Sequence, residues 1–361
     1  MPGVARIRTL VLHVGLHHTG GDFLTESLRV LRPQLHRHGV ALLTDDDLAG
    51  LSHRDGWATR PDSAAEIATD FEGELRVVAG AALDAARRSA TTPRTLLITS
   101  AELSGRRPPG LGDRDTFRPF AEPAIRQVVD ALDPGRVQIV LHTRRQDRLM
   151  ECCYVSEVQR GRHHSFPHQF PNRYEPVFSY VALVERLMAL PRVRGVRVRP
   201  YETIGAGTVS FVDGFLGAVG LSGRLDLSDL ATEHHESSLY SRNALRLALA
   251  MNPHLDTERE RSLVRSFLLE EFPSPPYTEA RFISKKSRAR IIDAYRDDNE
   301  HLFSTHMPDL PRDSYASLEA TRRLGSAAPA VPVSAQPFMQ RARRAAARRL
   351  QRVRRHPDRR E

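Results

Sequence analysis

The chain has 361 residues, of which 40% are hydrophobic and 27% are charged, a composition typical of a globular protein and unlike that of a disordered or fibrous one. No apolar run approaches the ~18–20 residues of a membrane-spanning helix, and the N-terminal segment lacks the separate apolar region of a secretory signal. The only cysteines, Cys152 and Cys153, are neighbours, which predicts free thiols, a reducing compartment and a cytoplasmic protein.

Short apolar runs alternate with helical patterns in the first part of the chain. The run that ends at Gly15 predicts a buried strand, the stretch GLHHTGG follows, and Asp22 is expected to be the N-cap of a helix that ends at Gly39. Strands are expected at 9–14, 95–99, 137–141 and 193–201, with helices near 80–90 and 147–160. This alternation predicts a three-layer α/β fold with a central, mostly parallel sheet of four or five strands and helices on both faces.

The C-terminal part of the domain is expected to be helical. Helical patterns lie at 240–251, 257–270 and 285–303. The segment GSAAPAVPVSAQP predicts a flexible linker. The expected organisation is therefore an α/β domain at 1–324, a linker at 325–337 and a basic tail at 338–361.

The positive charge of the chain is concentrated in the tail. The net charge is +9, and residues 337–361 hold ten arginines against Asp358 and Glu361. We expect a solvated, disordered arm in the free protein. Contact with an anionic membrane surface, worth about 1 kcal/mol per arginine, is the second interpretation and would place the protein at the inner membrane face. Binding to nucleic acid or an acidic carrier remains open, but no specific nucleic acid is expected.

Two segments carry the features of an anion-binding site. Gly15 and Gly20 have the spacing of a phosphate-binding loop, but Gly21 and Asp22 stand where Lys and Ser or Thr would follow. Such a turn either binds phosphate or only packs a helix on a strand.

The second segment follows the strand expected at 137–141. Arg144 lies at the carboxyl end of this strand, where open α/β sheets bind ligands, and Cys152 lies on the next helix. Together they are suited to a second phosphate. Alternatively, Arg144 and Arg145 are surface charges that pair with Asp147 or Glu151.

These motifs resemble the bacterial branch of the sulfotransferase family, which uses 3′-phosphoadenosine 5′-phosphosulfate. That branch opens close to LHIGLHKTGTTSLQ, where this chain reads LHVGLHHTGGDFLT, and its second hallmark is close to RRQDEFLESLY, where this chain reads RRQDRLMECCY. Weaker similarities are TSAELS near Glu102, RVRPYE at 197–202, HHESSL at 234–239 and AYRDDNEHL at 294–302. The resemblance covers about residues 9 to 310 and implies a P-loop-like nucleotide-binding fold.

The resemblance also implies an activity and a set of site residues. The chain would move a sulfuryl group from this donor, as co-substrate, to a hydroxyl of a carbohydrate, lipid or secondary metabolite, with no metal. Residues that hold the 5′-phosphosulfate fall on Gly15, His17, His18, Thr19, Gly20, Gly21 and Asp22. Ligands of the 3′-phosphate fall on Arg144 and Cys152, and the general base toward the acceptor falls on Glu102.

The chain departs from the family pattern at the donor site. His18 replaces the loop lysine, and Gly21 and Asp22 replace a pair of threonines. Cys152, a weak donor, replaces a serine. Two functions stay open: a working sulfotransferase in which a protonated His18 assists the leaving oxygen, and a non-catalytic binding protein that has lost the donor lysine.

The remaining reactive side chains give no clear signal. The chain has 16 histidines, but no HxxxH pair with an acidic third ligand, so no metal site is expected. The two cysteines are expected to be structural. The sequence identifies neither the acceptor nor the oligomeric state.

Overall fold

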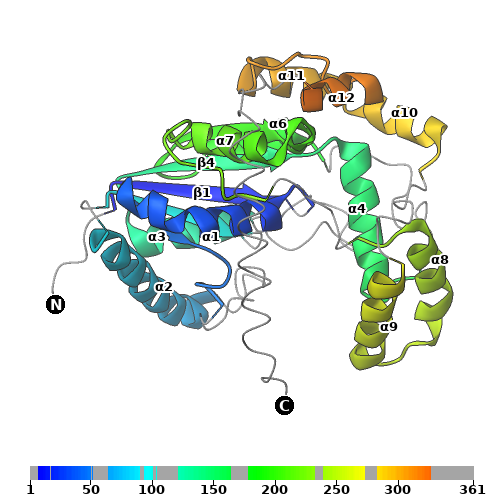
Figure 1. Cartoon of the computed structure of the whole chain (residues 1–361), viewed down its shortest axis with the longest axis horizontal. Helices are drawn as coiled ribbons and strands as arrows, with labels where there is room; N and C mark the ends of the chain where they lie inside the picture. Colours follow the sequence, from blue (N-terminus) through cyan, green and yellow to red (C-terminus); the bar gives the residue numbers. More distant parts are fainter. Residues whose placement is uncertain are drawn as a thin grey trace, which may run out of the picture. The chain divides into compact units, whose positions relative to one another are not determined.

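The structure is a computed structural model that describes residues 7–16, 18–49, 51, 64–89, 93–100, 103, 121–163, 178–231, 239–272 and 283–326. Its strands are β1 (Thr9–Gly15), β2 (Val40–Leu43), β3 (Thr95–Ser100), β4 (Arg136–Thr143) and β5 (Val193–Pro200). They form one sheet in the order β2-β3-β1-β4-β5, with every neighbouring pair parallel. Figure 1 shows this sheet with the helices around it.

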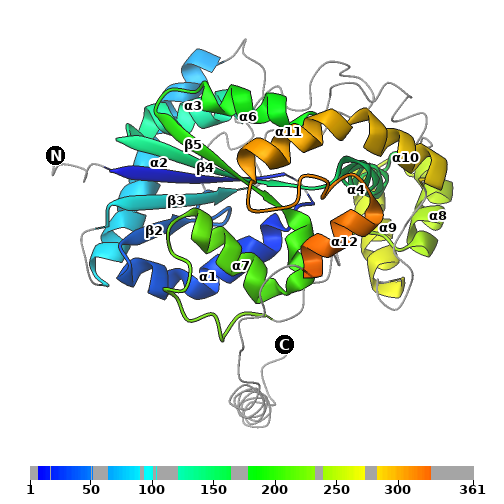
Figure 2. The same cartoon turned by 90° about the horizontal axis from the view of Figure 1, so that it is seen from above.

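Helices cover both faces of the sheet. One face is covered by α1 (Gly21–Arg37) and α7 (Thr208–Ala218), and the other by α2 (Ala64–Arg87), α3 (Ala121–Leu132) and α6 (Tyr180–Met188). Figure 2 shows α1 and α7 on the side of the sheet opposite to α3 and α6. In β1, Leu10 and Leu12 pack on the second group, whereas Val11 packs against Leu24 and Phe215 of the first. The predicted three-layer α/β fold is confirmed.

Strand β2, which the structure contains, is not among the strands predicted from the sequence. Its four residues follow Gly39, whose φ of 73° ends the first helix in a left-handed turn. An apolar run this short does not distinguish a strand from a loop that packs on the core.

The remaining helices form the C-terminal part of the domain. They are α4 (Gln146–Gln159), α8 (Arg242–Met251), α9 (Glu258–Glu271), α10 (Lys285–Ala294), α11 (Arg296–His306) and α12 (Leu318–Ser326), with short 3₁₀ turns η4 (Tyr201–Ala206) and η5 (Asn252–His254). The expected single helix at 285–303 is wrong, because Tyr295 ends α10 with a non-helical backbone and α11 starts at the next residue. The Tyr295 side chain is buried in the core, which a straight helix would not allow together with the packing of α11.

The chain divides after Ser326 into two units. The first unit contains all described residues. Apart from the last two residues of α12, the predicted linker and tail lie outside the described residues. None of the helices in the described ranges is long and apolar enough to cross a membrane.

Candidate functional site

The carboxyl ends of β1 and β4 lie at the topological switch point, where the order of the strands reverses. From β1 the chain passes through α1 to β2 on one flank, whereas from β4 it continues to β5 on the other. Ligands of open α/β proteins bind at such a switch point, because the two connections diverge and leave space between them. The glycine-rich loop follows β1 there, and Arg144 follows β4.

The loop after β1 is held by its own hydrogen bonds. Both the backbone N–H and the hydroxyl of Thr19 donate to the Leu16 carbonyl, at 3.1 and 2.5 Å. His18 and Gly20 have φ values of 66° and 78°. The hydroxyl of Thr19, 1% exposed, therefore serves the loop itself.

Helix α1 begins directly after this loop. Gly20 is its N-cap, and no side chain caps the helix. The expectation that Asp22 is the N-cap is wrong: Asp22 is the second helical residue and is exposed, because the left-handed Gly20 already directs the chain into the helix. The N–H groups of a first turn have no partner within their helix, and they carry the positive end of its dipole.

Arg144 contacts this loop. Its side chain is largely buried, its Nη1 donates to the His18 carbonyl at 2.7 Å, and its Cζ lies 4.6 Å from the centre of the Tyr201 ring. Tyr201 also packs against Gly20, where an added Cβ would lie 3.0 Å from the ring. The structure thus brings together His18, Gly20 and Arg144, as the resemblance requires.

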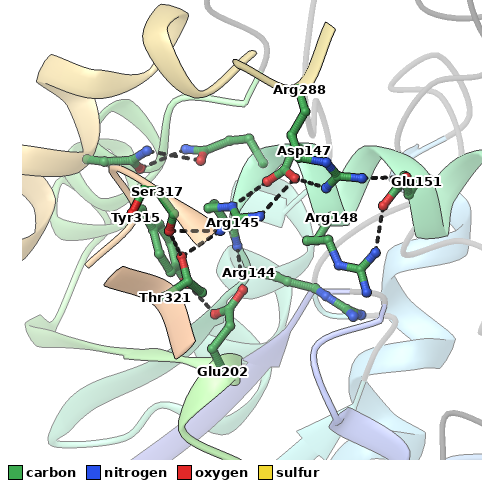
Figure 3. A network of polar contacts seen from close by, with 12 residues as sticks. Arg144, Arg145, Asp147, Arg148, Glu151, Glu202, Arg288, Tyr315, Ser317 and Thr321 are labelled. Atoms are coloured by element: carbon green, nitrogen blue, oxygen red, sulfur yellow. Dashed lines mark hydrogen bonds and ion pairs between the residues drawn. The ribbon is translucent and has the colours of Figure 1, made fainter. Parts of the chain in front are cut away.

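A network of buried ion pairs lies next to Arg144 and begins at its neighbour Arg145 (Figure 3). The Asp147 carboxylate, fully buried, accepts from Arg145 at 2.5 and 3.0 Å and also from Arg288. Arg288 donates further to Glu151 at 2.8 Å, and Arg148 donates to the other oxygen of Glu151 at 2.7 Å. Each carboxylate is therefore shared by two guanidinium groups.

The same network reaches η4, which follows β5, and α12. Glu202 accepts from the backbone N–H of Arg145 at 2.9 Å and from the Tyr315 hydroxyl at 2.7 Å, and Arg145 Nη1 donates to Thr321 at 2.6 Å. Burial, and then the charge of Glu202, raise the pKa of Tyr315 well above its usual value. Tyr315 therefore stays protonated and keeps donating to Glu202.

This arrangement bears on the alternative interpretation, in which Arg144 and Arg145 are surface charges. Arg145 pairs with Asp147, but both are buried, and Arg144 contacts the loop, so the interpretation as surface charges is wrong. In formal charge, the cluster holds four arginines against Asp147, Glu151 and Glu202. Arg144 donates to the loop at the positive end of α1, and a cation beside that end of a helix favours an anion, although the exposed Asp22 carboxylate lies in the same first turn.

A second polar cluster lies beneath the loop, on the face covered by α1 and α7. His13 Nε2 lies 3.0 Å from His142 Nδ1, His13 Nδ1 lies 2.8 Å from the Thr99 hydroxyl, and Thr99 lies 3.1 Å from the Thr25 hydroxyl. Burial lowers the pKa of His13 to about 3. Burial, and then the neighbouring His13 and Arg199, lower the pKa of His142. Both imidazoles are therefore neutral, and they link β4, β1, β3 and α1.

The other predicted site residues differ in how the structure places them. A Cβ on Gly15 would lie 3.3 Å from the His13 ring, whereas one on Gly21 would meet nothing within 4 Å. Cys152 lies on α4, 3% exposed among core side chains, and both cysteines are free thiols. His17 and Glu102 lie outside the described residues.

Sequence reasoning missed the partners that hold the arginine pair, Arg288, Glu202 and Tyr315. Glu202 ends the segment RVRPYE, to which the sequence analysis gave no role, and no local motif marks Arg288 or Tyr315, because each comes from a distant segment. Among the described residues, no group of three His, Cys, Asp or Glu side chains is arranged to hold a metal ion.

Comparison with known proteins adds no family to this description. No family model matches the chain, and no curated protein matches it.

Proposed function

We propose that the chain transfers a sulfuryl group from 3′-phosphoadenosine 5′-phosphosulfate to a hydroxyl of a carbohydrate, lipid or secondary metabolite. The observation that carries the proposal is the contact between Arg144 and the glycine-rich loop, at 2.7 Å, at the switch point of the sheet. A donor with phosphate groups on both the 3′ and 5′ positions needs two cationic elements near one another. The end of α1 and Arg144 provide them.

Each residue has a role in this proposal. The first turn of α1 binds the 5′-phosphosulfate through backbone N–H groups, and Arg144 binds the 3′-phosphate, with Cys152 as a weaker neighbour. Glu102 takes the proton of the acceptor hydroxyl while the oxygen of that hydroxyl bonds to sulfur. The bond from sulfur to the bridging oxygen breaks, and His18 stabilises the charge that develops on adenosine 3′,5′-bisphosphate.

A non-catalytic binding protein on the same scaffold is the second candidate. The Thr19 hydroxyl is used within the loop, and the first turn of α1 carries the exposed Asp22 in place of a hydroxyl donor. Both features weaken the interaction with an anionic sulfuryl donor relative to the family pattern. They leave the cationic Arg144 in place.

Adenosine 3′,5′-bisphosphate is expected to raise the melting temperature of the protein. A ligand that binds only the folded state at about 100 times its Kd adds about 2.7 kcal/mol to the free energy of unfolding. Arg144→Gln should lose most of this shift, whereas Arg296→Gln, on the exposed surface of α11, should keep it. Equal shifts in both variants would remove Arg144 from the site, and no shift in the wild type would contradict the proposed function.

Restoring the family loop is expected to tighten nucleotide binding. His18→Lys adds a permanent cation, and Asp22→Thr removes an exposed carboxylate from the positive end of α1, worth about 0.3–1 kcal/mol. The double variant should bind adenosine 3′,5′-bisphosphate several-fold more tightly by isothermal titration. Asp297→Thr, in the first turn of α11, is the control for removing a helix-terminal carboxylate. Weaker binding by the restored loop would mean that His18 and Asp22 serve a different ligand.

A further inference from the structure

The edge of the sheet opposite to the candidate site is strongly basic. The parallel strands begin at this edge and the helices that precede them end there. Its described segments are residues 7–9, 36–40, 84–89, 93–95, 130–137 and 188–194. They contain eight arginines and three aspartates, and all eight arginines are exposed.

Six of these arginines form no ion pair with any carboxylate of the described residues, whereas Arg87 and Arg192 are paired with Asp84 and Asp133. We call the six the amino-edge patch: Arg8, Arg37, Arg88, Arg94, Arg136 and Arg194.

Backbone hydrogen bonds fix the centre of the patch. The N–H of Arg8 donates to the Arg94 carbonyl at 3.1 Å, and the N–H of Arg136 donates to the Arg8 carbonyl at 3.1 Å. Arg136 is the first residue of β4, whereas Arg8 and Arg94 directly precede β1 and β3, so the backbones of the three arginines lie side by side at this edge of the sheet.

The patch extends over both faces of the sheet. Arg8 and Arg94 precede the register pair Thr9 and Thr95, whereas Arg136 is itself in register with Thr9. Arg136 Nε donates to the Thr9 hydroxyl at 2.9 Å, and Thr9 alternates with Leu10, so Arg136 lies on the face of the sheet that α1 and α7 cover. Arg37 and Arg88 extend the patch at the ends of α1 and α2, one on each face. The positive charge thus covers a surface, not a line.

Helix dipoles stabilise only some of the arginines in the patch. A cation in the last turn of a helix is stabilised by the negative end of the dipole, which explains Arg37 and Arg88. Arg8, Arg94 and Arg136 stand at the starts of strands, where no such end is formed by their own elements. None of these three forms an ion pair with a carboxylate within the described part of the molecule.

We propose that the amino-edge patch binds the surface of an anionic lipid bilayer. A bilayer presents phosphate and carboxylate groups in two dimensions, which matches a patch that covers both faces of the edge. Near the patch, no described aromatic side chain is exposed on which the bases of a single strand would stack; Phe267, on α9, is the exposed large aromatic residue of the described ranges.

The tail supplies a second, independent argument that the partner is an anionic bilayer. Residues 337–361 carry ten arginines in the sequence, and adhesion to a membrane by charge usually requires more than one basic element. The inference does not depend on the proposed sulfuryl transfer, since the candidate site lies at the other edge of the sheet.

The test is site-resolved modification of arginines in the full chain. p-Hydroxyphenylglyoxal labels accessible guanidinium groups, and peptide mass spectrometry reports each one. Phosphatidylcholine vesicles that contain phosphatidylserine should protect Arg8, Arg94 and Arg136, whereas vesicles of phosphatidylcholine alone should not. Arg290 and Arg322, which are exposed on α10 and α12, serve as internal controls and should be labelled equally with both.

A pair of variants gives the affinity. R8Q/R94Q/R136Q should bind the anionic vesicles at least about tenfold more weakly than the wild type. R290Q/R312Q/R322Q removes the same charge from other exposed positions and should bind within about twofold of the wild type.

Three results would overturn the proposal. Protection confined to the tail would show that the tail alone binds the bilayer. An equal loss in both triple variants would show attraction by net charge alone. Protection of the patch by duplex DNA or heparin, without protection by anionic vesicles, would assign it to a soluble polyanion.

Discussion

Asp147→Ala is expected to lower the free energy of unfolding by about 3–5 kcal/mol, because the change leaves two buried guanidinium groups without their carboxylate. The Asp147 side chain is 0% exposed, and those of its partners Arg145 and Arg288 are 1% and 10% exposed. Water therefore cannot replace the lost carboxylate without opening the junction between β4, α4 and α10. Chemical denaturation at neutral pH measures the effect.

Asp293→Ala is the matched control for this change. Asp293 also pairs with an arginine, Arg296, but their side chains are 62% and 50% exposed. Exposed pairs are worth about 0–1 kcal/mol, so this variant should remain close to the wild type. If both variants lose the same small amount, the Asp147 network does not stabilise the fold as we describe.

Acidification below pH 6.5 is expected to destabilise the protein through its buried histidines. Burial lowers the pKa of His13 to about 3 in the folded state, against its ordinary value of 6.5 in the unfolded chain. Between these values the unfolded chain binds a proton that the folded chain does not. Stability is therefore unaffected above 6.5 and decreases as the pH falls toward 3. At pH 5, His13 lowers the free energy of unfolding by about 2 kcal/mol relative to its value above pH 6.5.

His13→Gln isolates this contribution. The variant should lose stability less steeply than the wild type between pH 6 and 4, by up to about 1.4 kcal/mol per pH unit. His254→Gln removes an exposed imidazole and serves as the control. Urea unfolding at several pH values gives both slopes, and parallel slopes for His13→Gln and the wild type would show that His13 gains its proton in the folded state.

The sequence allows prediction of most of the sheet and of the place of the site. Apolar runs at β1, β3, β4 and β5 are bounded by glycine or polar residues, so their period and length identify them as buried strands. Arg144 could be placed at a strand end for the same reason. The four-residue β2 and the interruption at Tyr295 depend on tertiary packing, which no local pattern encodes.

The roles of the two neighbouring arginines could not be separated from the sequence. Arg144 and Arg145 differ by one position, yet one contacts the loop and the other is buried with Asp147. Distant partners set the difference: Arg288 gives the buried Asp147 carboxylate a second cation, and Glu202 accepts from the backbone N–H of Arg145. The place of Asp22 in its helix could not be predicted either. The left-handed backbone of Gly20 makes Gly20 the N-cap, so that Asp22 is the second helical residue.

The ion-pair network also sets an order of events during synthesis on the ribosome. Asp147 is translated 141 residues before its partner Arg288, and Arg145 176 residues before Thr321. The nascent chain therefore exposes the β4–α4 junction, in which Asp147 and Glu151 still lack their second arginine, Arg288, until the last helices have left the exit tunnel. Because such distant contacts close slowly, the carboxyl end of the sheet is expected to be the last part of the domain to mature and the part most dependent on an intact C-terminal region.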